Sequence, residues 1–289
     1  MLQAQKSLKK LYVIQTRYTL INNNVNNKNW RGGRGRDPDE LFKLLLDDDR
    51  LKTRSDIFFG YTLPAIAKAV DDGYNIIHNI FHFDAFPSWL LNLIGDAQKK
   101  YPWFHAHSFA LNDECSLQDT LRSTIRNSKH LHNSEERLYF AGIRLDDDDV
   151  IGGEYFLKLS AYLAPAFVGF AVSFPKGYAA LWDGVAFSKF AELYKEKHAQ
   201  GIAQINSYDP ASGSFAHSRV MIPGAHLMVD QQVPTILDSR GSPTYLRSFH
   251  KSNDKYVARR ELQEKQLKKV FEKELNASDL APNIICTLS

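Results

Sequence analysis

The stretch Leu138-Tyr139-Phe140-Ala141-Gly142-Ile143-Arg144-Leu145-Asp146-Asp147-Asp148-Asp149 decides the fold class of the chain. Its first six residues are apolar, as in a central strand that is buried on both faces of a sheet. Four consecutive carboxylates close the stretch, and ligands of open α/β sheets bind beyond the carboxyl ends of the strands. The stretch therefore predicts a buried strand that ends at a polar site.

Strand and helix patterns alternate around this stretch. Leu11-Tyr12-Val13-Ile14 and the segments 75–80 and 103–109 have the composition of strands. Asp37-Pro38-Asp39-Glu40 and Ser116-Leu117-Gln118-Asp119 have the capping residues with which helices begin. The alternation predicts an α/β fold with a mixed, mostly parallel sheet that is flanked by helices.

The second half of the chain has a more varied pattern. The apolar runs 167–174 and 178–181 are joined by Pro175-Lys176-Gly177, which predicts a β-hairpin. Residues 185–198 have the pattern of a helix, and residues 254–275 that of a charged amphipathic helix. We expect one large domain over residues 1–253 and a C-terminal amphipathic helix and tail over residues 254–289.

The composition of the chain argues against several classes of protein. With 289 residues, of which 44% are hydrophobic, the chain can bury one large core. The 36 Lys and Arg residues against 33 Asp and Glu residues leave a net charge of only +3, which argues against nucleic acid as a partner. Two cysteines without metal-ligand spacing, and no signal peptide or membrane span, predict a cytoplasmic protein that at most contacts the inner face of a membrane.

The four carboxylates at the strand end point to a bound metal ion. Adjacent carboxylates disfavour one another's ionised forms, so a hard divalent cation such as Mg²⁺ or Mn²⁺ is expected between them. Such an ion completes its shell with phosphates, which a nucleoside diphosphate sugar supplies, and Arg144 can grip a phosphate or balance the charge. A solvated acidic turn is the alternative, as we expect for Asp47-Asp48-Asp49. If repulsion dominates, Asp146→Ala and Asp148→Ala leave the metal-free stability unchanged or higher.

Several motifs resemble a family of bacterial rhamnosyltransferases with the GT-A fold, over roughly residues 10–255. These motifs are Arg144-Leu145-Asp146-Asp147-Asp148-Asp149-Val150, Leu46-Asp47-Asp48-Asp49-Arg50-Leu51-Lys52-Thr53-Arg54, Val13-Ile14-Gln15-Thr16-Arg17, Thr62-Leu63-Pro64 and Phe174-Pro175-Lys176-Gly177-Tyr178. The resemblance implies a GT-A-like glycosyltransferase domain whose Asp-x-Asp motif is Asp146 and Asp148, with Asp149 beside them. The late His250 resembles the histidine that adds a further ligand to the metal in many such enzymes.

The resemblance also implies a nucleotide-sugar donor site and a donor class. The donor-binding residues expected at the strand ends are Thr16, Arg17, Asp84, Arg144, Asp146 and Asp147. The donor expected is a dTDP- or UDP-sugar, with dTDP-rhamnose as the first choice, and the acceptor a hydroxyl of a glycan or lipid-linked glycan.

Residues beyond the acidic run are candidates for the acceptor side. Asp183, in Leu181-Trp182-Asp183-Gly184, is the expected base that deprotonates the acceptor hydroxyl. Trp182 could offer an apolar platform for a sugar ring, and His217 could face the acceptor.

Two other functions stay open. A sugar-phosphate nucleotidyltransferase would use the same carboxylates and Mg²⁺, but its Gly-rich loop should directly follow the first strand, where Gln15-Thr16-Arg17-Tyr18 stands. A non-catalytic carbohydrate- or Ca²⁺-binding protein could use the same acidic run.

Overall fold

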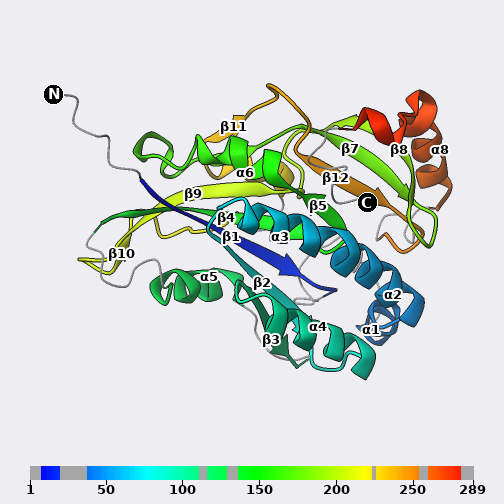
Figure 1. The fold of residues 1–289 in the computed structure, drawn as a ribbon, viewed down its shortest axis with the longest axis horizontal. Helices are drawn as coiled ribbons and strands as arrows, with labels where there is room; N and C mark the ends of the chain where they lie inside the picture. The colour runs from blue at the N-terminus through cyan, green and yellow to red at the C-terminus, as the bar shows by residue number, and fades with distance from the viewer. Residues whose placement is uncertain are drawn as a thin grey trace.

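The computed structural model describes residues 8–19, 38–110, 116–128, 136–222, 226–253 and 260–280. These residues form two sheets with helices packed around them (Figure 1). The Asn- and Gly-rich segment 22–36 and the first six residues of the helix expected over 254–275 lie outside the described residues.

A large sheet forms the centre of the fold. Along its main path the strands are ordered β11 (Thr235–Leu237), β6 (Ala171–Ser173), β9 (Ile202–Asp209), β4 (Leu138–Asp146), β1 (Lys9–Arg17), β2 (Ile76–Phe83) and β3 (Phe104–Phe109), and β10 (Ser214–Phe215) pairs with β9. Strands β4, β1, β2 and β3 are parallel, whereas β9 is antiparallel to both of its neighbours, β4 and β6. The predicted α/β class, with a mixed, mostly parallel sheet flanked by helices, is confirmed.

Helices cover both faces of the large sheet because its strands alternate apolar side chains to either side. The elements are α1 (Pro38–Leu45), α2 (Asp48–Ile57), a π-helical turn (Phe58–Thr62), α3 (Leu63–Asp71), α4 (Ser88–Lys100), α5 (Leu117–Arg126) and α6 (Gly153–Ser160). Tyr12 and Ile14 of β1 pack with α3 and α6, whereas Leu11 and Val13 pack with α5 on the opposite face. Gly142 of β4 is required by close packing, because a Cβ atom there would lie 2.2 Å from the carbonyl oxygen of Val220.

A smaller sheet continues from the acidic run. Its strands are ordered β5 (Asp149–Ile151), β12 (Tyr245–Phe249), β7 (Lys176–Trp182) and β8 (Phe187–Tyr194). The hairpin predicted across Pro175-Lys176-Gly177 is wrong, because β6 belongs to the large sheet and β7 to the small one. The helix predicted over 185–198 is also wrong, because these residues contain β8, which pairs antiparallel with β7. The true hairpin is β7–β8.

The C-terminal segment packs on the small sheet. It contains α8 (Arg260–Val270) and the 3₁₀ turns Phe271–Lys273 and Ala277–Asp279. Elsewhere, a 3₁₀ turn lies at Pro165–Phe167, and His226–Gln231 contains two 3₁₀ pieces with a kink at Met228 between them. The backbone N–H of Leu275 donates to the carbonyl of Phe190 in β8, and the Phe271 ring lies 6.2 Å from that of Phe249. In the described part of the chain, no helix is both long enough and apolar enough to cross a bilayer.

Candidate active site

The acidic run joins the two sheets, since Asp146 ends β4 and Asp149 begins β5. Its four carboxylates do not all lie exposed at the mouth of the sheet. Asp147, Asp148 and Asp149 are 2%, 8% and 2% exposed, and each has its own polar partners, whereas the side chain of Asp146 is 40% exposed. The turn between the two strands therefore buries three of the carboxylates among polar partners and leaves Asp146 partly exposed.

Arg54 of α2 neutralises two of these carboxylates. Its Nη1 atom forms a buried ion pair with Oδ1 of Asp147, and its Nη2 atom lies 3.1 Å from Oδ2 of Asp148. The backbone N–H and the hydroxyl of Thr19, just after β1, also donate to Asp147, at 3.0 and 3.1 Å. The planar guanidinium group suits this bridging role, because its fork presents two nitrogens to two acceptors.

His250 and Asn253 approach Asp148 from the end of β12. The Nε2 atom of His250 lies 3.1 Å from Oδ2 of Asp148 and 2.9 Å from the side-chain nitrogen of Asn253, which itself donates to Asp148 at 3.0 Å. The nitrogen of a neutral imidazole can donate to Asp148 or accept from Asn253, but it cannot do both at once. A cation between Oδ2 and Nε2 would use the lone pairs of both atoms.

Burial and charge set the protonation of these groups. Burial raises the pKa of Asp147 to about 6, although Arg54 opposes the shift. Burial would also raise the pKa of Asp148, but Arg54 and the hydrogen bond from His250 outweigh it and hold that pKa below its usual range. Burial lowers the pKa of His250 despite the neighbouring Asp148 carboxylate. Asp148 is therefore an ionised carboxylate, which can ligate a metal ion through oxygen, and it lies beside a neutral imidazole.

Asp149 and Asp146 contact other residues. The side-chain nitrogen of Gln200 donates to Asp149, and burial raises the pKa of Asp149 well above its usual value. The Nε atom of Arg144 lies 3.7 Å from Oδ1 of Asp146, and both line a small pocket of about 80 Å³ together with Arg17. Arg17 is also the register partner of Asp146 across β1 and β4.

The structure thus brings several predicted residues together. Asp148 and His250 lie in contact, and Arg17, Arg144 and Asp146 share the small pocket. Among the described residues, however, no group of three or more His, Cys, Asp or Glu side chains is placed to hold a metal ion. Metal ligands beyond Asp148 and His250 would have to come from a substrate and from water.

Other predicted residues lie elsewhere. Thr16 is fully buried, and its hydroxyl bonds to Nε2 of His78 at 2.9 Å, so this side chain faces the core. Asp84 follows β2 and is exposed at the same edge of the sheet as Arg17. His217 is held through its backbone by Asn206, whose register partner Phe140 lies six residues before Asp146 on β4, a span of about 20 Å. The structure therefore does not bring His217 to the acidic run.

Trp182 ends β7, and Asp183 follows it in the turn to β8. Strands β12 and β7 are parallel with Phe249 opposite Leu181, which places His250 level with Trp182. Trp182 is 7% exposed and packs against Tyr61 and Phe187, so its ring belongs to the core and is not an open platform. The exposed Asp183 accepts the backbone N–H groups of Val185 and Ala186 in the β7–β8 turn, and these bonds lower its pKa.

Sequence reasoning missed Arg54, Arg50 and Asn253. Arg50 and Arg54 are 4% and 5% exposed although the run Asp47-Asp48-Asp49 beside them is exposed, as expected of a solvated helix end. Asp47 caps α2 by accepting the N–H of Arg50, whose guanidinium reaches the carbonyl of Ser252. Arg50 and Arg54 are four residues apart and therefore lie on one face of α2. This spacing was the signal in the sequence by which they could have been found.

One comparison with known proteins shows the family of the chain. A search of curated proteins gives no match to the sequence. Among solved structures, a mannosyltransferase from Pyrobaculum calidifontis, in complex with GDP-mannose and Mn²⁺, is similar with a TM-score of 0.37 and 12% sequence identity, covering 98% of this chain and 69% of its own. Residues 34–261 match the model of the family described as "Putative rhamnosyl transferase". This match spans most of the sequence, and the chain belongs to that family of glycosyltransferases.

Proposed function

We propose that the chain is a metal-dependent glycosyltransferase in which Asp148 and His250 hold Mn²⁺ or Mg²⁺ beside the diphosphate of a nucleotide sugar. The observation that carries the proposal is the 3.1 Å approach of Nε2 of His250 to Oδ2 of Asp148 at the ends of β12 and β4. A carboxylate and a neutral imidazole suit Mn²⁺, and such ions commonly take one or two protein carboxylates and complete their shell with phosphate and water. When bound, the metal would neutralise the charge that develops on the departing diphosphate.

The neighbouring cations support a diphosphate at this edge. Arg17 and Arg144 line the small pocket that contains Asp146, and both present planar groups that can bind phosphate oxygens. Arg54 holds Asp147 and Asp148 in place, so that Asp148 keeps its orientation toward His250. In this arrangement Asp146 belongs to the donor side and Asp148 and His250 to the metal. Asp147 and Asp149, which were expected at the donor and at the metal, are instead buried against Arg54, Thr19 and Gln200 and support the turn.

The donor in this proposal is a dTDP- or UDP-sugar, with rhamnose as the sugar, as the family description supports. The acceptor is a hydroxyl of a surface glycan or lipid-linked glycan. Asp183 is the proposed base because it lies one residue beyond the position level with His250. Its lowered pKa makes it a weak base, so deprotonation has to accompany bond formation to the sugar.

The alternatives fit less well. Ca²⁺ takes six to eight oxygen ligands, whereas the pair described here contributes an imidazole nitrogen, which favours Mn²⁺ over a Ca²⁺-binding role. A nucleotidyltransferase would need its Gly-rich loop directly after the first strand, where Tyr18 is buried against Phe58 and Thr19 bonds to Asp147.

Turnover of nucleotide sugars tests the proposal. The purified protein is incubated with a panel of nucleotide sugars, with and without Mn²⁺, and the released nucleoside diphosphate is measured. We expect metal-dependent release from a deoxythymidine or uridine diphosphate sugar, lost in Asp148→Asn and retained in His217→Ala. Release of pyrophosphate from a nucleoside triphosphate and a sugar phosphate would instead identify a nucleotidyltransferase.

A further inference from the structure

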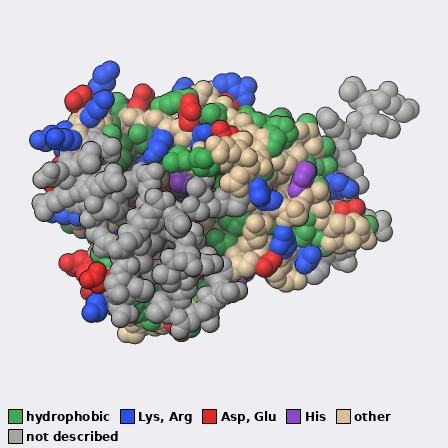
Figure 2. Space-filling model, turned by 180° about the vertical axis from the view of Figure 1, so that it is seen from behind, with side chains coloured by type: hydrophobic (Ala, Val, Ile, Leu, Met, Phe, Trp, Pro, Cys, Tyr) green, Lys and Arg blue, Asp and Glu red, His purple; other side chains and the backbone are tan. Residues whose placement is uncertain are grey.

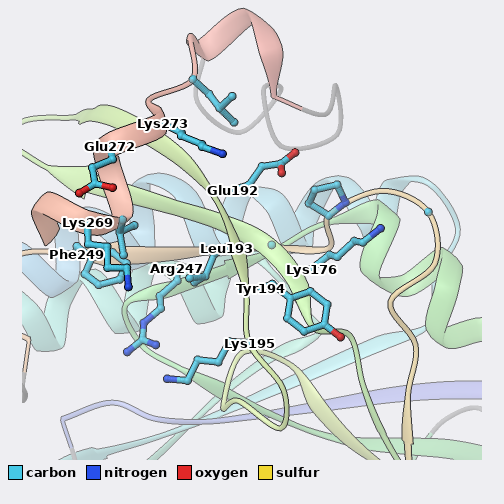
Figure 3. Close-up of a pocket in the computed structure, with 15 residues that line it drawn as sticks. Lys176, Glu192, Leu193, Tyr194, Lys195, Arg247, Phe249, Lys269, Glu272 and Lys273 are labelled. Atoms are coloured by element: carbon cyan, nitrogen blue, oxygen red, sulfur yellow. The ribbon is translucent and has the colours of Figure 1, made fainter. Parts of the chain in front are cut away.

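A second cavity lies between the small sheet and the C-terminal segment (Figure 3). It encloses about 990 Å³, which is at the upper end of the size of small-ligand pockets. Strands β7, β8 and β12 contribute one side, and the end of α8 with the turn after it contributes the other. Among the sequence motifs discussed above, only Phe174-Pro175-Lys176-Gly177-Tyr178 contributes to this cavity, through Lys176 and Gly177.

The cavity is strongly basic. Its ionisable lining residues are five cations against two anions: Lys176, Lys195, Arg247, Lys269 and Lys273 against Glu192 and Glu272. The whole chain has 36 basic and 33 acidic residues, so the excess of three positive charges in the cavity equals that of the whole sequence. In the described part of the chain, no salt bridge joins Lys176, Lys269 or Lys273 to either glutamate. Figure 2 shows Lys and Arg side chains gathered over α8, at the upper left of the view.

Aromatic and aliphatic side chains lie among these charges. The Tyr194 side chain is 58% exposed, and the guanidinium of Arg247 lies 5.3 Å from the centre of the Phe249 ring. In the view of Figure 3, Arg247, Lys195 and Lys269 occupy one side of the cavity, and Lys176 and Tyr194 the other. Rings beside hydrogen-bond donors suit a saccharide, which presents apolar C–H faces as well as polar groups.

The cavity is also connected to the acidic run. Arg247 is the register partner of Asp149 across β12 and β5, so these two residues lie directly opposite each other on neighbouring strands. Phe249, at the same end as Arg247, directly precedes His250. A ligand that contacts Arg247 would therefore lie against the strand pair that carries Asp149, the residue next to Asp148 of the proposed metal site.

We propose that this cavity binds the glycosyl acceptor and that the acceptor is an acidic saccharide, one whose sugar rings carry carboxylate or phosphate groups. The inference rests on the proposed glycosyltransferase function and adds the chemical class of the acceptor. Positive charge alone would also suit an anionic membrane surface. A concave cavity of about 990 Å³, however, offers contacts on several sides of a ligand, which suits a saccharide better than the flat surface of a bilayer.

Calorimetric titration of the full chain with defined saccharides tests the proposal. The probes are a short oligogalacturonate, which carries carboxylates, glucose 6-phosphate, which carries a phosphate, and a neutral malto-oligosaccharide of the same length as the first. We expect one acidic probe to bind at least about tenfold more tightly than the neutral one, since charge-assisted hydrogen bonds are stronger than neutral ones. Which acidic probe binds separates carboxylate from phosphate recognition.

Substitutions of residues that line the cavity test whether the saccharide probes bind there. Lys176→Gln combined with Lys269→Gln removes one cation from each side of the cavity and should weaken binding of the acidic probe by about fivefold or more. Tyr194→Ala should weaken all saccharides, and Tyr194→Phe should bind as the wild type. Lys99→Gln is the matched control, because Lys99 is an exposed cation on α4 that pairs with Asp96.

The outcomes separate this inference from the proposed function. Equal binding of acidic and neutral probes, or full binding by the double lysine variant, overturns the acidic-acceptor inference whatever the donor does. Binding of the whole chain to phosphatidylglycerol vesicles, lost in the double variant, without binding of any saccharide probe, would identify a membrane contact and also overturns it. Absence of nucleoside diphosphate binding in the presence of Mn²⁺ overturns the proposed function, and a preserved, lysine-dependent preference for acidic saccharides would then still establish the cavity as a saccharide site.

Discussion

The Nε2 atom of His250 lies 3.1 Å from the Oδ2 atom of Asp148, although 102 residues separate them in the sequence. The contact forms because β12 pairs with β5, the strand that directly follows Asp148. The small sheet thus positions the imidazole of His250 next to the carboxyl end of β4. The proposed metal site depends on this pairing of two distant segments.

Loss of Arg54 should destabilise the metal-free protein strongly. Arg54→Ala leaves Asp147 and Asp148 buried without their shared cation, and breaking a buried ion pair typically costs about 3–5 kcal/mol. Arg54→Lys should recover only part of this loss, because one ammonium group cannot present a fork to two carboxylates. Urea denaturation measures the change. Lys68→Ala, which removes the exposed pair with Asp72, should cost less than about 1 kcal/mol, and equal losses in the two variants would refute the role of burial.

Because of the ion pair with Arg54, Asp148→Ala should change the stability in the direction opposite to the one expected if repulsion between carboxylates dominated. Asp148→Ala should now lower the stability of the metal-free protein, because it removes the partner of Arg54, His250 and Asn253. Asp146→Ala should have a smaller effect, since that side chain is 40% exposed. Thermal unfolding with a chelator present compares the two. A stability of Asp148→Ala equal to or above that of the wild type would restore the repulsion argument.

Stability should fall as the pH decreases below about 6.5, because His78 is buried as a neutral group. Burial lowers the pKa of His78 to about 3, so between the two values the unfolded chain binds a proton that the folded chain does not. The loss is at most about 1.4 kcal/mol per pH unit for this histidine. His198, whose pKa burial lowers to about 4, acts in the same direction. Urea denaturation at pH 7 and pH 5 should show a smaller loss in His78→Gln, and an identical loss in both proteins would contradict the assignment.

Asp183→Asn separates a catalytic role from a structural one. The amide oxygen of Asn can still accept the N–H groups of Val185 and Ala186, so the turn should persist. If Asp183 is the base, turnover should fall by about a hundredfold or more, while nucleoside diphosphate binding is unchanged. Steady-state kinetics and a binding titration measure the two effects. Unchanged turnover would leave Asp183 with its role in the turn alone.

The sequence predicted what depends on local pattern. Apolar runs predicted β1, β2 and β4, and the acidic run predicted the polar end of β4. The small sheet was missed because the register partners of β7 and β12 are 68 residues apart in the sequence. In addition, the register of β7–β8 shifts at Leu181 and Trp182, which breaks the alternation of β8. Arg54 was missed because its partner Asp147 lies 93 residues away. Helical spacing shows which residues share a face of a helix, but it does not show which other residues that face packs against.

The coordination of bound Mn²⁺ tests the central claim most directly. Electron spin echo envelope modulation is recorded on the protein with Mn²⁺ and a nucleoside diphosphate, because this signal detects nitrogen bonded to the ion. We predict modulation from an imidazole nitrogen in the wild type and in His217→Ala, and its loss in His250→Ala, with Mn²⁺ affinity reduced in both His250→Ala and Asp148→Asn. Nitrogen modulation that persists in His250→Ala, or Mn²⁺ affinity that is unchanged in Asp148→Asn, would contradict the account.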